Sequence, residues 1–345
     1  MADYYEGGRI LSVNDANGNK PEVLMSCGNR TAGKTTYWNK YVTNIYKKHI
    51  GKFMLLYRFD YELDDVDEKF FKDIHNIFFP NDIMTAKRKM KGVYTELFLN
   101  EESCGYAVAI NKADMIKKIS HLFVDVEVML FDEFQSETNH YCPNEVDKLK
   151  SIHTSVARGK NKQVRFVPLI MVSNCVSLIN PYFVAMGISN RLRSDTKILK
   201  GDGFVLEQVF NENAAKAQLE SGFNRAFGSD NRYLAYSTQN VYLNDNTAFI
   251  EKPEGRAKYI ATIRCDGRDY GIKEYAESGY IYCDKKPDYT FPLKITVTTE
   301  DHNVNYVMLK RNDFIIQNMR YFFEHGSFRF SDLQCKDAVL KMLSY

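Results

Sequence analysis

Short apolar runs separated by polar stretches divide the first 200 residues into expected strands and helices. Four runs are almost continuously apolar, which is typical of strands that are buried on both faces: residues 23–25, 52–59, 128–131 and 166–172. Three stretches between them have apolar positions at helical spacing: residues 36–48, 68–79 and 143–157. Strands that alternate with helices indicate an α/β domain with a largely parallel sheet.

The pattern changes after residue 200. Residues 201–245 contain one short helical run, 212–220, and a stretch rich in Gly, Ser and Asn, which suits a connecting region. Beyond it we expect five strands, at 249–252, 258–265, 270–275, 280–284 and 293–298, and two helices, at 311–324 and 331–344. Strands followed by helices indicate an α+β module. We therefore divide the chain into a domain at 1–200, a linker at 201–245 and a second domain at 246–345.

The composition is that of a globular protein and narrows the function only slightly. The chain has 345 residues and a formal net charge of +2, so any nucleic-acid contact must come from local basic groups. Seven scattered cysteines without a C-x-x-C pair argue for reduced thiols in a cytosolic setting, and against a zinc site or disulfides. No apolar run reaches the roughly 18 residues of a membrane span, and the first residues do not resemble a signal peptide.

The strand at 23–25 leads into a phosphate-binding loop. Residues 28–35 fit G-x-x-x-x-G-K-[ST] and stand between an expected strand and an expected helix, the context that this motif requires. Lys34 is expected to reach the β- and γ-phosphates of ATP, and the Thr35 hydroxyl to ligate Mg²⁺. The ATP-binding residues would be Gly28, Asn29, Arg30, Thr31, Ala32, Gly33, Lys34, Thr35 and Thr36. The alternative is a chance glycine turn before a core helix.

Two adjacent carboxylates, Asp132 and Glu133, end the strand at 128–131. Asp132 suits the Walker B role of holding Mg²⁺ through water, and Glu133 suits that of the general base for an attacking water. The adjacent glutamate separates this chain from kinases and small GTPases. It indicates the P-loop class with an additional strand between the two motifs and a catalytic glutamate. The strand at 52–59, or one from the segment at 60–127, would supply the additional strand.

Three further groups have more than one interpretation. Asn174, after the strand at 166–172, would sense the γ-phosphate or orient water, or would only form a turn. Arg158 would be an arginine finger for a neighbouring subunit's nucleotide, or one more charge on a DNA-facing loop with Lys160 and Lys162. Residues 60–127 would be a lid over the nucleotide, which we favour, or an elaborated edge of the sheet. They contain an expected basic turn at 87–92, with Lys87, Arg88, Lys89 and Lys91, and an expected hairpin at 93–110.

The chain resembles the DNA-packaging ATPases of phi29-type tailed bacteriophages, the small ring motors that pump the genome into a prohead. The resemblance covers most of the chain. Its most discriminating part is the Asn-Pro-Tyr-Phe run at 180–183, because many ATPases share the nucleotide motifs. The segments that carry it are 28–35, 131–134, 143–146, 173–183, 249–252, 298–301 and 326–330.

This resemblance implies an ATPase that acts on double-stranded DNA as a homo-oligomeric ring, expected to be a pentamer. It implies docking on the portal vertex of the prohead, with or without a packaging RNA. It also implies a place in the host cytoplasm, and absence from the mature virion. Lys34, Thr35, Asp132 and Glu133 take the roles given above, and Arg158 stands where the family has its trans-acting arginine.

The resemblance also implies an RNase H-like second domain. Its acidic residues, Asp266, Asp269, Asp284 and Asp301, have no spacing that demands a two-metal cluster, so we interpret the domain as gripping DNA without cutting it. Basic groups at 87–91 and 160–162 would contact phosphates rather than bases, because a packaging motor must accept any sequence. The alternative functions are a helicase and a nucleotide-dependent protein switch.

Overall fold

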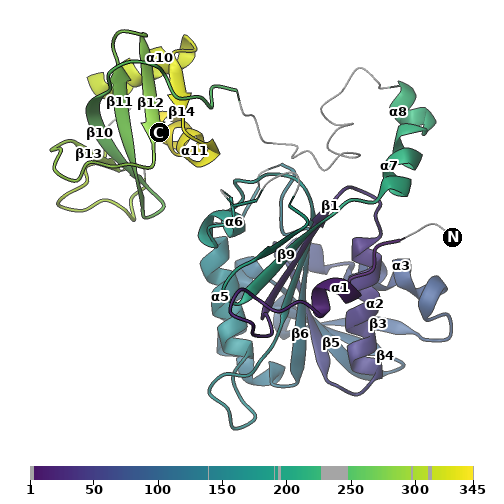
Figure 1. Cartoon of the computed structure of the whole chain (residues 1–345). Helices are drawn as coiled ribbons and strands as arrows, with labels where there is room; N and C mark the ends of the chain where they lie inside the picture. Colours follow the sequence, from purple (N-terminus) through teal and green to yellow (C-terminus); the bar gives the residue numbers. More distant parts are fainter. Residues whose placement is uncertain are drawn as a thin grey trace. The chain divides into compact units, whose positions relative to one another are not determined.

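The computed structural model describes residues 4–138, 140–189, 191–192, 196–226, 248–296, 298–309 and 313–344. The chain divides into two compact units, Met1–Asn244 and Asp245–Tyr345 (Figure 1).

The first unit is organised around one large mixed sheet. Across its described residues the strand order is β3-β4-β5-β2-β6-β7-β1-β9-β8. The strands are β1 (Val23–Gly28), β2 (Lys52–Tyr57), β3 (Met84–Lys89), β4 (Tyr94–Leu99), β5 (Glu102–Ala109), β6 (Val126–Asp132), β7 (Leu169–Asn174), β8 (Ile198–Lys200) and β9 (Phe204–Val209). Six neighbouring strands run parallel, namely β5, β2, β6, β7, β1 and β9. Their carboxyl ends therefore lie at one edge of the sheet, which is the edge where α/β sheets bind ligands.

Helices cover both faces of this sheet. The helices of the first unit are α1 (Gly8–Leu11), α2 (Lys34–Lys47), α3 (Val66–Phe78), α4 (Ala113–Lys118), α5 (Glu145–Val156), α6 (Pro181–Ala185), α7 (Glu212–Leu219) and α8 (Gly222–Ala226), with 3-10 turns η1 (Asp60–Leu63), η2 (Met90–Gly92), η3 (Ile110–Lys112) and η4 (Ser120–Phe123). Helices α7 and α8 follow β9 and extend away from the sheet (Figure 1). Side chains of α1, α2 and α3 share one buried cluster with the sheet, and those of α4, α5 and α6 share the other. The expected strand and helix alternation is therefore confirmed.

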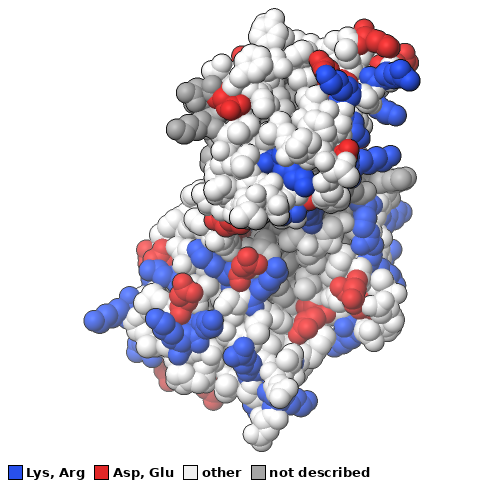
Figure 2. Space-filling view, turned by 90° about the vertical axis from the view of Figure 1, so that its left-hand side faces the viewer, with Lys and Arg blue, Asp and Glu red and all other residues white. Residues whose placement is uncertain are grey.

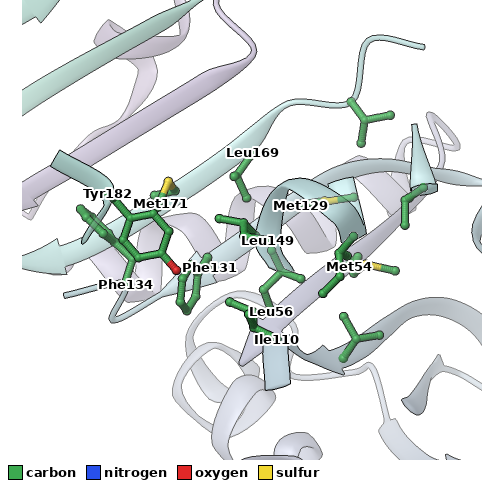
Figure 3. Close-up of a cluster of buried hydrophobic side chains, with 14 of the residues drawn as sticks. Met54, Leu56, Ile110, Met129, Phe131, Phe134, Leu149, Leu169, Met171 and Tyr182 are labelled. Carbon is green, nitrogen blue, oxygen red and sulfur yellow. The ribbon is translucent and has the colours of Figure 1, made fainter. Parts of the chain in front are cut away.

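The α5 face is filled by large apolar side chains. Figure 3 shows Leu149 of α5 lying among side chains from the sheet strands, with Tyr182 of α6 beside Phe134. The rings of Phe134 and Tyr182 meet edge to face at 5.7 Å between centroids. This packing fixes α5 and α6 over the carboxyl edge, next to the segment that follows β6.

Residues 60–127 elaborate the edge of the sheet and do not stand apart from it as a lid, although Glu62, Lys69 and Phe70 line the cavity beside Asp132. They provide α3, β3, β4, β5 and α4, and β5 pairs with β2 in parallel, so the segment extends the main sheet. The expected basic turn at 87–92 is also wrong in part, because residues 87–89 form the end of edge strand β3 and only 90–92 turn. An edge strand carries few core contacts, which is why its charged sequence looked like a turn.

The strand between the two nucleotide motifs is β7. It pairs with β1 on one side and with β6 on the other, so neither the strand at 52–59 nor one from 60–127 takes that place. Strand β2 lies beyond β6 instead. Chain order does not reveal this arrangement, because β7 follows both motifs in the sequence and inserts between them in space.

The expected linker begins too early. Residues 204–209 form β9, which pairs with β1 in parallel along its whole length. Phe204, Val205 and Leu206 are buried in the cores of the first unit. The expected helix at 212–220 is confirmed as α7. Residues 227–245 of the expected linker lie outside the described residues.

The second unit is an α+β module. Its described strands are β10 (Lys258–Cys265), β11 (Arg268–Tyr275), β12 (Tyr280–Asp284), β13 (Lys294–Thr296) and β14 (Phe328–Phe330), in the order β13-β10-β11-β12-β14. Helices α10 (Phe314–Glu324) and α11 (Leu333–Ser344) share its core. The predicted strand at 249–252 is wrong, since only Ile250 makes an isolated bridge there, to Phe330.

Candidate nucleotide-binding site

The glycine loop connects the end of β1 to the start of α2. Gly33 precedes α2 with a φ of 88°, in the left-handed region that favours glycine. Gly28 lies against β9, where a Cβ atom would come within 2.4 Å of the Val209 carbonyl oxygen. Both glycines are therefore required by the backbone itself, which supports the P-loop interpretation over a chance turn.

Lys34 points back into this loop. Its Nζ donates to the carbonyl oxygen of Asn29 at 2.8 Å, and the side chain is almost fully buried. Burial lowers the pKa of Lys34, because the ammonium has lost most of its water. A phosphate in the loop would supply the negative charge that this buried cation lacks.

Asp132 and Thr35 come together beside it. Burial raises the pKa of Asp132 to about 6, and the charge of Glu133 adds to the effect, while a hydrogen bond from the Thr35 hydroxyl opposes it. The Glu133 amide also donates to Asp132 Oδ1 at 2.9 Å. A hydroxyl and a carboxylate are ligands that suit Mg²⁺, which typically takes one or two protein groups together with substrate phosphates and water. The residues present therefore fit this ion.

A cavity of about 360 Å³ opens beside these groups. Its lining includes Thr35, Asn39, Tyr57, Asp132 and Glu133. Glu133 itself is exposed and has a φ of 55°, a left-handed conformation that is unusual for a residue with a side chain. The neighbouring structure must hold it there, since such a conformation costs of the order of 1 kcal/mol or more.

Part of that support is a buried ion pair that the sequence did not reveal. Arg58, just after β2, bonds Glu145 of α5 through Nε at 3.0 Å, and its Nη2 donates to the carbonyl oxygens of Glu133 and Phe134 at 3.3 and 2.8 Å. Glu145 also accepts from the Tyr182 hydroxyl at 2.7 Å. The only available signal was an arginine within an otherwise apolar strand pattern.

Asn174 lies at the same edge. It is the last residue of β7, and its Cα partner in the parallel pairing with β1 is Gly28, the first residue of the glycine loop. The structure thus brings Asn174 to the P-loop, with β6 and its two carboxylates on the other side of β7.

The outer residues of the loop are held by local contacts. Arg30 pairs with Glu137, which follows the acidic pair in sequence. Thr31 has a φ of 60°, and its hydroxyl donates to the Arg30 carbonyl at 2.7 Å. Arg30 is therefore a bridge between the glycine loop and the segment after β6.

Arg158 lies at the other end of the sheet. It follows α5 and is exposed. Arg165, at the far end of the same turn, donates to the Val126 carbonyl oxygen at 3.1 Å and to the Val156 carbonyl oxygen at 2.9 Å. Because Val126 is the first residue of β6, this turn lies beside the amino end of that strand. From Val126 to Asp132 the strand spans about 20 Å at roughly 3.3 Å per residue. Figure 1 shows the turn after α5 at the end of the unit opposite α6. The structure therefore does not bring Arg158 to the site of its own chain.

The basic residues proposed to contact DNA form two separate groups. One is on edge strand β3 and the turn after it, where Arg88 pairs with Asp64, Lys89 pairs with Glu96, and Lys87 and Lys91 are exposed. The other is the turn after α5, where Lys160 pairs with Glu127 and Lys162 is exposed. Figure 2 shows Lys and Arg interspersed with Asp and Glu on the face that it draws. The two groups belong to different edges of the sheet.

Three of the four acidic residues considered for a metal cluster in the second unit pair with cations. Arg264 holds Asp269 with two bonds of 2.8 Å, Lys273 bonds Asp284 at 2.6 Å, and Lys341 bonds Asp266 at 2.9 Å. Asp301 accepts from the Gly267 amide at 3.1 Å. Among the described residues no group of three or more His, Cys, Asp or Glu side chains could hold a metal ion. In the same residues, no helix is long and apolar enough to span a membrane.

Comparisons with known proteins identify relatives of this chain. The chain is 24% identical to the DNA packaging protein of Bacillus phage phi29 over 322 residues, covering 92% of this chain and 90% of the relative. It is 25% identical to that of Bacillus phage B103 over 309 residues, covering 88% and 91%. A chain of the phi29 viral genome packaging motor assembly has a similar fold, with a TM-score of 0.68 at 22% identity, covering 99% of this chain and 98% of that one.

A second solved structure, the Phi-28 gp11 DNA packaging motor, aligns with a TM-score of 0.64 at 16% identity, over 100% of this chain and 99% of that one. The model of the podovirus DNA encapsidation protein (Gp16) family matches residues 3–344. The resemblance inferred from the sequence is thereby confirmed, and the chain belongs to the podovirus DNA encapsidation protein (Gp16) family.

Proposed function

We propose that this protein is an ATP-driven translocase that packages double-stranded viral DNA into a preformed prohead as a homo-oligomeric ring. The observation that carries the proposal is the meeting of Lys34, Thr35, Asp132 and Asn174 at one edge of the sheet, in a chain of a DNA encapsidation family. Glu133 beside them would be the general base that hydrolysis needs.

In this mechanism the loop from Gly28 to Thr36 binds the phosphates of ATP through its backbone amides and Lys34. Thr35 and Asp132 would hold Mg²⁺, and the bound ion would supply positive charge beside the nucleotide phosphates. Glu133 takes the proton of the attacking water, and the cavity beside it gives that water room. Asn174 orients the same water or senses the γ-phosphate. The order β1-β7-β6 supports membership of the additional-strand, catalytic-glutamate class.

Arg158 acts on the nucleotide of a neighbouring subunit. Its position at the amino edge, about 20 Å along the strand from Asp132, supports a role in trans over one in cis. A guanidinium is permanently charged and its forked shape suits phosphate. Arg58 lines the cavity of its own chain, but Glu145 and the Phe134 carbonyl engage its guanidinium. In a ring, a neighbour's Arg158 would provide the charge for the transferring phosphoryl.

The second unit grips DNA without cutting it. Ion pairs engage Asp266, Asp269 and Asp284, which leaves these carboxylates poorly placed to share metal ions. An RNase H-like class is supported by the antiparallel pairing of β10, β11 and β12 and by the parallel pairing of β13 with β10. The place of β14 beside β12 departs from that class, in which the two parallel strands are neighbours.

The first unit would also contact DNA phosphates. The proposed contacts are Lys87, Arg88, Lys89, Lys91, Lys160 and Lys162.

The assembly we propose is a pentameric ring docked on the portal vertex of the prohead in the host cytoplasm, with or without a packaging RNA, and absent from the mature virion. Ring assembly is favoured by the similar fold of a chain from a packaging motor assembly.

DNA-stimulated ATP hydrolysis tests the proposal. Glu133→Gln should bind ATP normally and lose hydrolysis, since it keeps the shape of the side chain but removes the base. Lys34→Ala should instead lose nucleotide affinity. A slow nucleotide-dependent switch predicts no stimulation by DNA, and a helicase predicts strand separation. Wild-type turnover by Glu133→Gln would refute the assigned chemistry.

A further inference from the structure

A buried glutamine links the acidic pair to the other parts of the site. Gln135 follows Glu133 by two residues and is 3% exposed. Its Oε1 accepts from the backbone amides of Val176 and Ser177 at 3.2 and 2.9 Å, and its Nε2 donates to Cys27 Sγ at 3.5 Å. The proposed mechanism gives this residue no role.

These partners come from β1 and from the segment after β7, the strand that lies between β6 and β1. Cys27 immediately precedes Gly28 of the glycine loop, and Val176 follows Asn174 by two residues. Cys27 and Ser173 are Cα partners in the pairing of β1 with β7, and their Sγ and Oγ atoms lie 3.6 Å apart. One side-chain amide therefore contacts the carboxyl ends of β7 and β1 from the segment that follows β6.

The contacts fix the amide in one orientation. Reversing it would set its NH₂ group against two backbone N–H donors, which is why the oxygen must face Val176 and Ser177. An amide oxygen accepts two hydrogen bonds, and both are used here. The backbone supports the same register, because the Phe134 amide donates to the Val172 carbonyl at 3.2 Å.

We propose that Gln135 is a positioning residue for hydrolysis, which sets the distance between Glu133 and Asn174 on either side of the attacking water. Glu133 has left-handed backbone geometry and needs neighbours that hold it. Arg58 holds its carbonyl oxygen from the side of β2, and Gln135 anchors the following residues from the side of β7. This inference rests on the proposed function, since it assigns Glu133 and Asn174 to the same water.

The test compares two substitutions of Gln135 with one at a matched position. Gln135→Leu removes the acceptor from two backbone N–H groups and lets the segment after Asn174 move. We expect kcat to fall about 10- to 100-fold, because an unsatisfied donor and a misplaced group cost about that much. The Kd for an unhydrolysable Mg–ATP analogue should stay within about threefold, since Lys34 and Thr35 are untouched. Gln135→Glu retains an acceptor oxygen and should restore most of kcat.

Asn180 is the matched control. It is 1% exposed, accepts from the Phe183 amide at 2.9 Å, and donates to the Ser177 carbonyl at 2.8 Å, so these two side-chain hydrogen bonds stay within residues 177–183. Asn180→Leu should destabilise the fold at least as much as Gln135→Leu and leave kcat within about threefold of wild type.

Three results would overturn the inference. They are near-wild-type kcat in Gln135→Leu, an equal loss of kcat in Asn180→Leu, or a loss of analogue affinity as large as the loss of kcat. Failure of the proposed function looks different, because it would appear with Gln135 intact, as ATP hydrolysis that DNA does not stimulate in the unsubstituted chain or as wild-type turnover in Glu133→Gln. Either result would remove both the function and this inference.

Discussion

The buried ion pair between Arg58 and Glu145 gives the sharpest stability prediction. Glu145 is 3% exposed and accepts from Arg58, from the Tyr182 hydroxyl at 2.7 Å and from the Cys142 amide at 2.8 Å. Glu145→Leu would leave the Arg58 guanidinium, itself 8% exposed, without its countercharge. Breaking a buried pair in this way costs about 3–5 kcal/mol. We therefore expect the free energy of unfolding of the first unit to fall by that amount.

The single tryptophan makes the measurement specific. Trp38 is fully buried in the core of the first unit, so its fluorescence during urea unfolding reports on that unit and not on the second. With a slope of about 3 kcal/mol per molar urea, the midpoint should fall by about 1–1.7 M. The control is Asp147→Leu on the same helix, which removes an exposed pair with Lys150 that is worth less than about 1 kcal/mol.

A double variant distinguishes the effect of the ion pair on stability from the effect of the packing around it. The double variant Arg58→Leu with Glu145→Leu should be more stable than Glu145→Leu alone, because no buried charge is left unpaired. A midpoint for Glu145→Leu within about 0.3 M of wild type would refute the reasoning, since it would mean that water or another group compensates Arg58.

Three further predictions concern the charge of the site, the extent of the first unit and the subunit contact. Burial raises the pKa of Asp132 to about 6, above its unfolded value, so its ionisation costs stability as the pH rises through about 4 to 6. Ligand-free Asp132→Asn should therefore exceed wild type in urea midpoint at pH 8, and the difference should vanish near pH 4. A chain ending at Ala226 should fold and bind ATP, whereas one ending at Gly201 should not, because it lacks β9; equal tryptophan unfolding curves for the two would contradict this. Arg158→Ala and Glu133→Gln subunits, each weakly active alone, should regain ATPase activity when co-assembled; no recovery at any mixing ratio would rule out action in trans.

The sequence predicted those parts of the fold that depend on local pattern. The strand at 258–265 and the strand at 280–284 have the bounds of β10 and β12, and the helix at 143–157 corresponds to α5. Residues 60–127 and 204–209 were misjudged because strand pairing decides their place. The charges of β3 are tolerated at a sheet edge, and β9 is buried only because β1 lies beside it.

The candidate site follows the same division. The glycine loop and the acidic pair have fixed spacing within one segment, so their residues could be named from the sequence. Arg58 and Gln135 could not, because each acts through partners that are more than 40 residues away along the chain, such as Glu145 and Cys27. A polar side chain in an apolar environment shows its purpose only when its hydrogen-bond partners are known.

The geometry of one subunit also constrains how subunits must meet. Asp132 lies at the carboxyl end of β6, and Arg158 lies in the turn beside its amino end. For Arg158 to reach a neighbour's phosphate, the amino edge of one sheet must face the carboxyl edge of the next. Repeating such a head-to-tail contact gives a ring or a filament, whereas a two-fold dimer would need one interface covering both edges. If Arg158 acts in trans as we propose, hydrolysis should consequently depend on protein concentration, because this arginine comes from a neighbouring subunit.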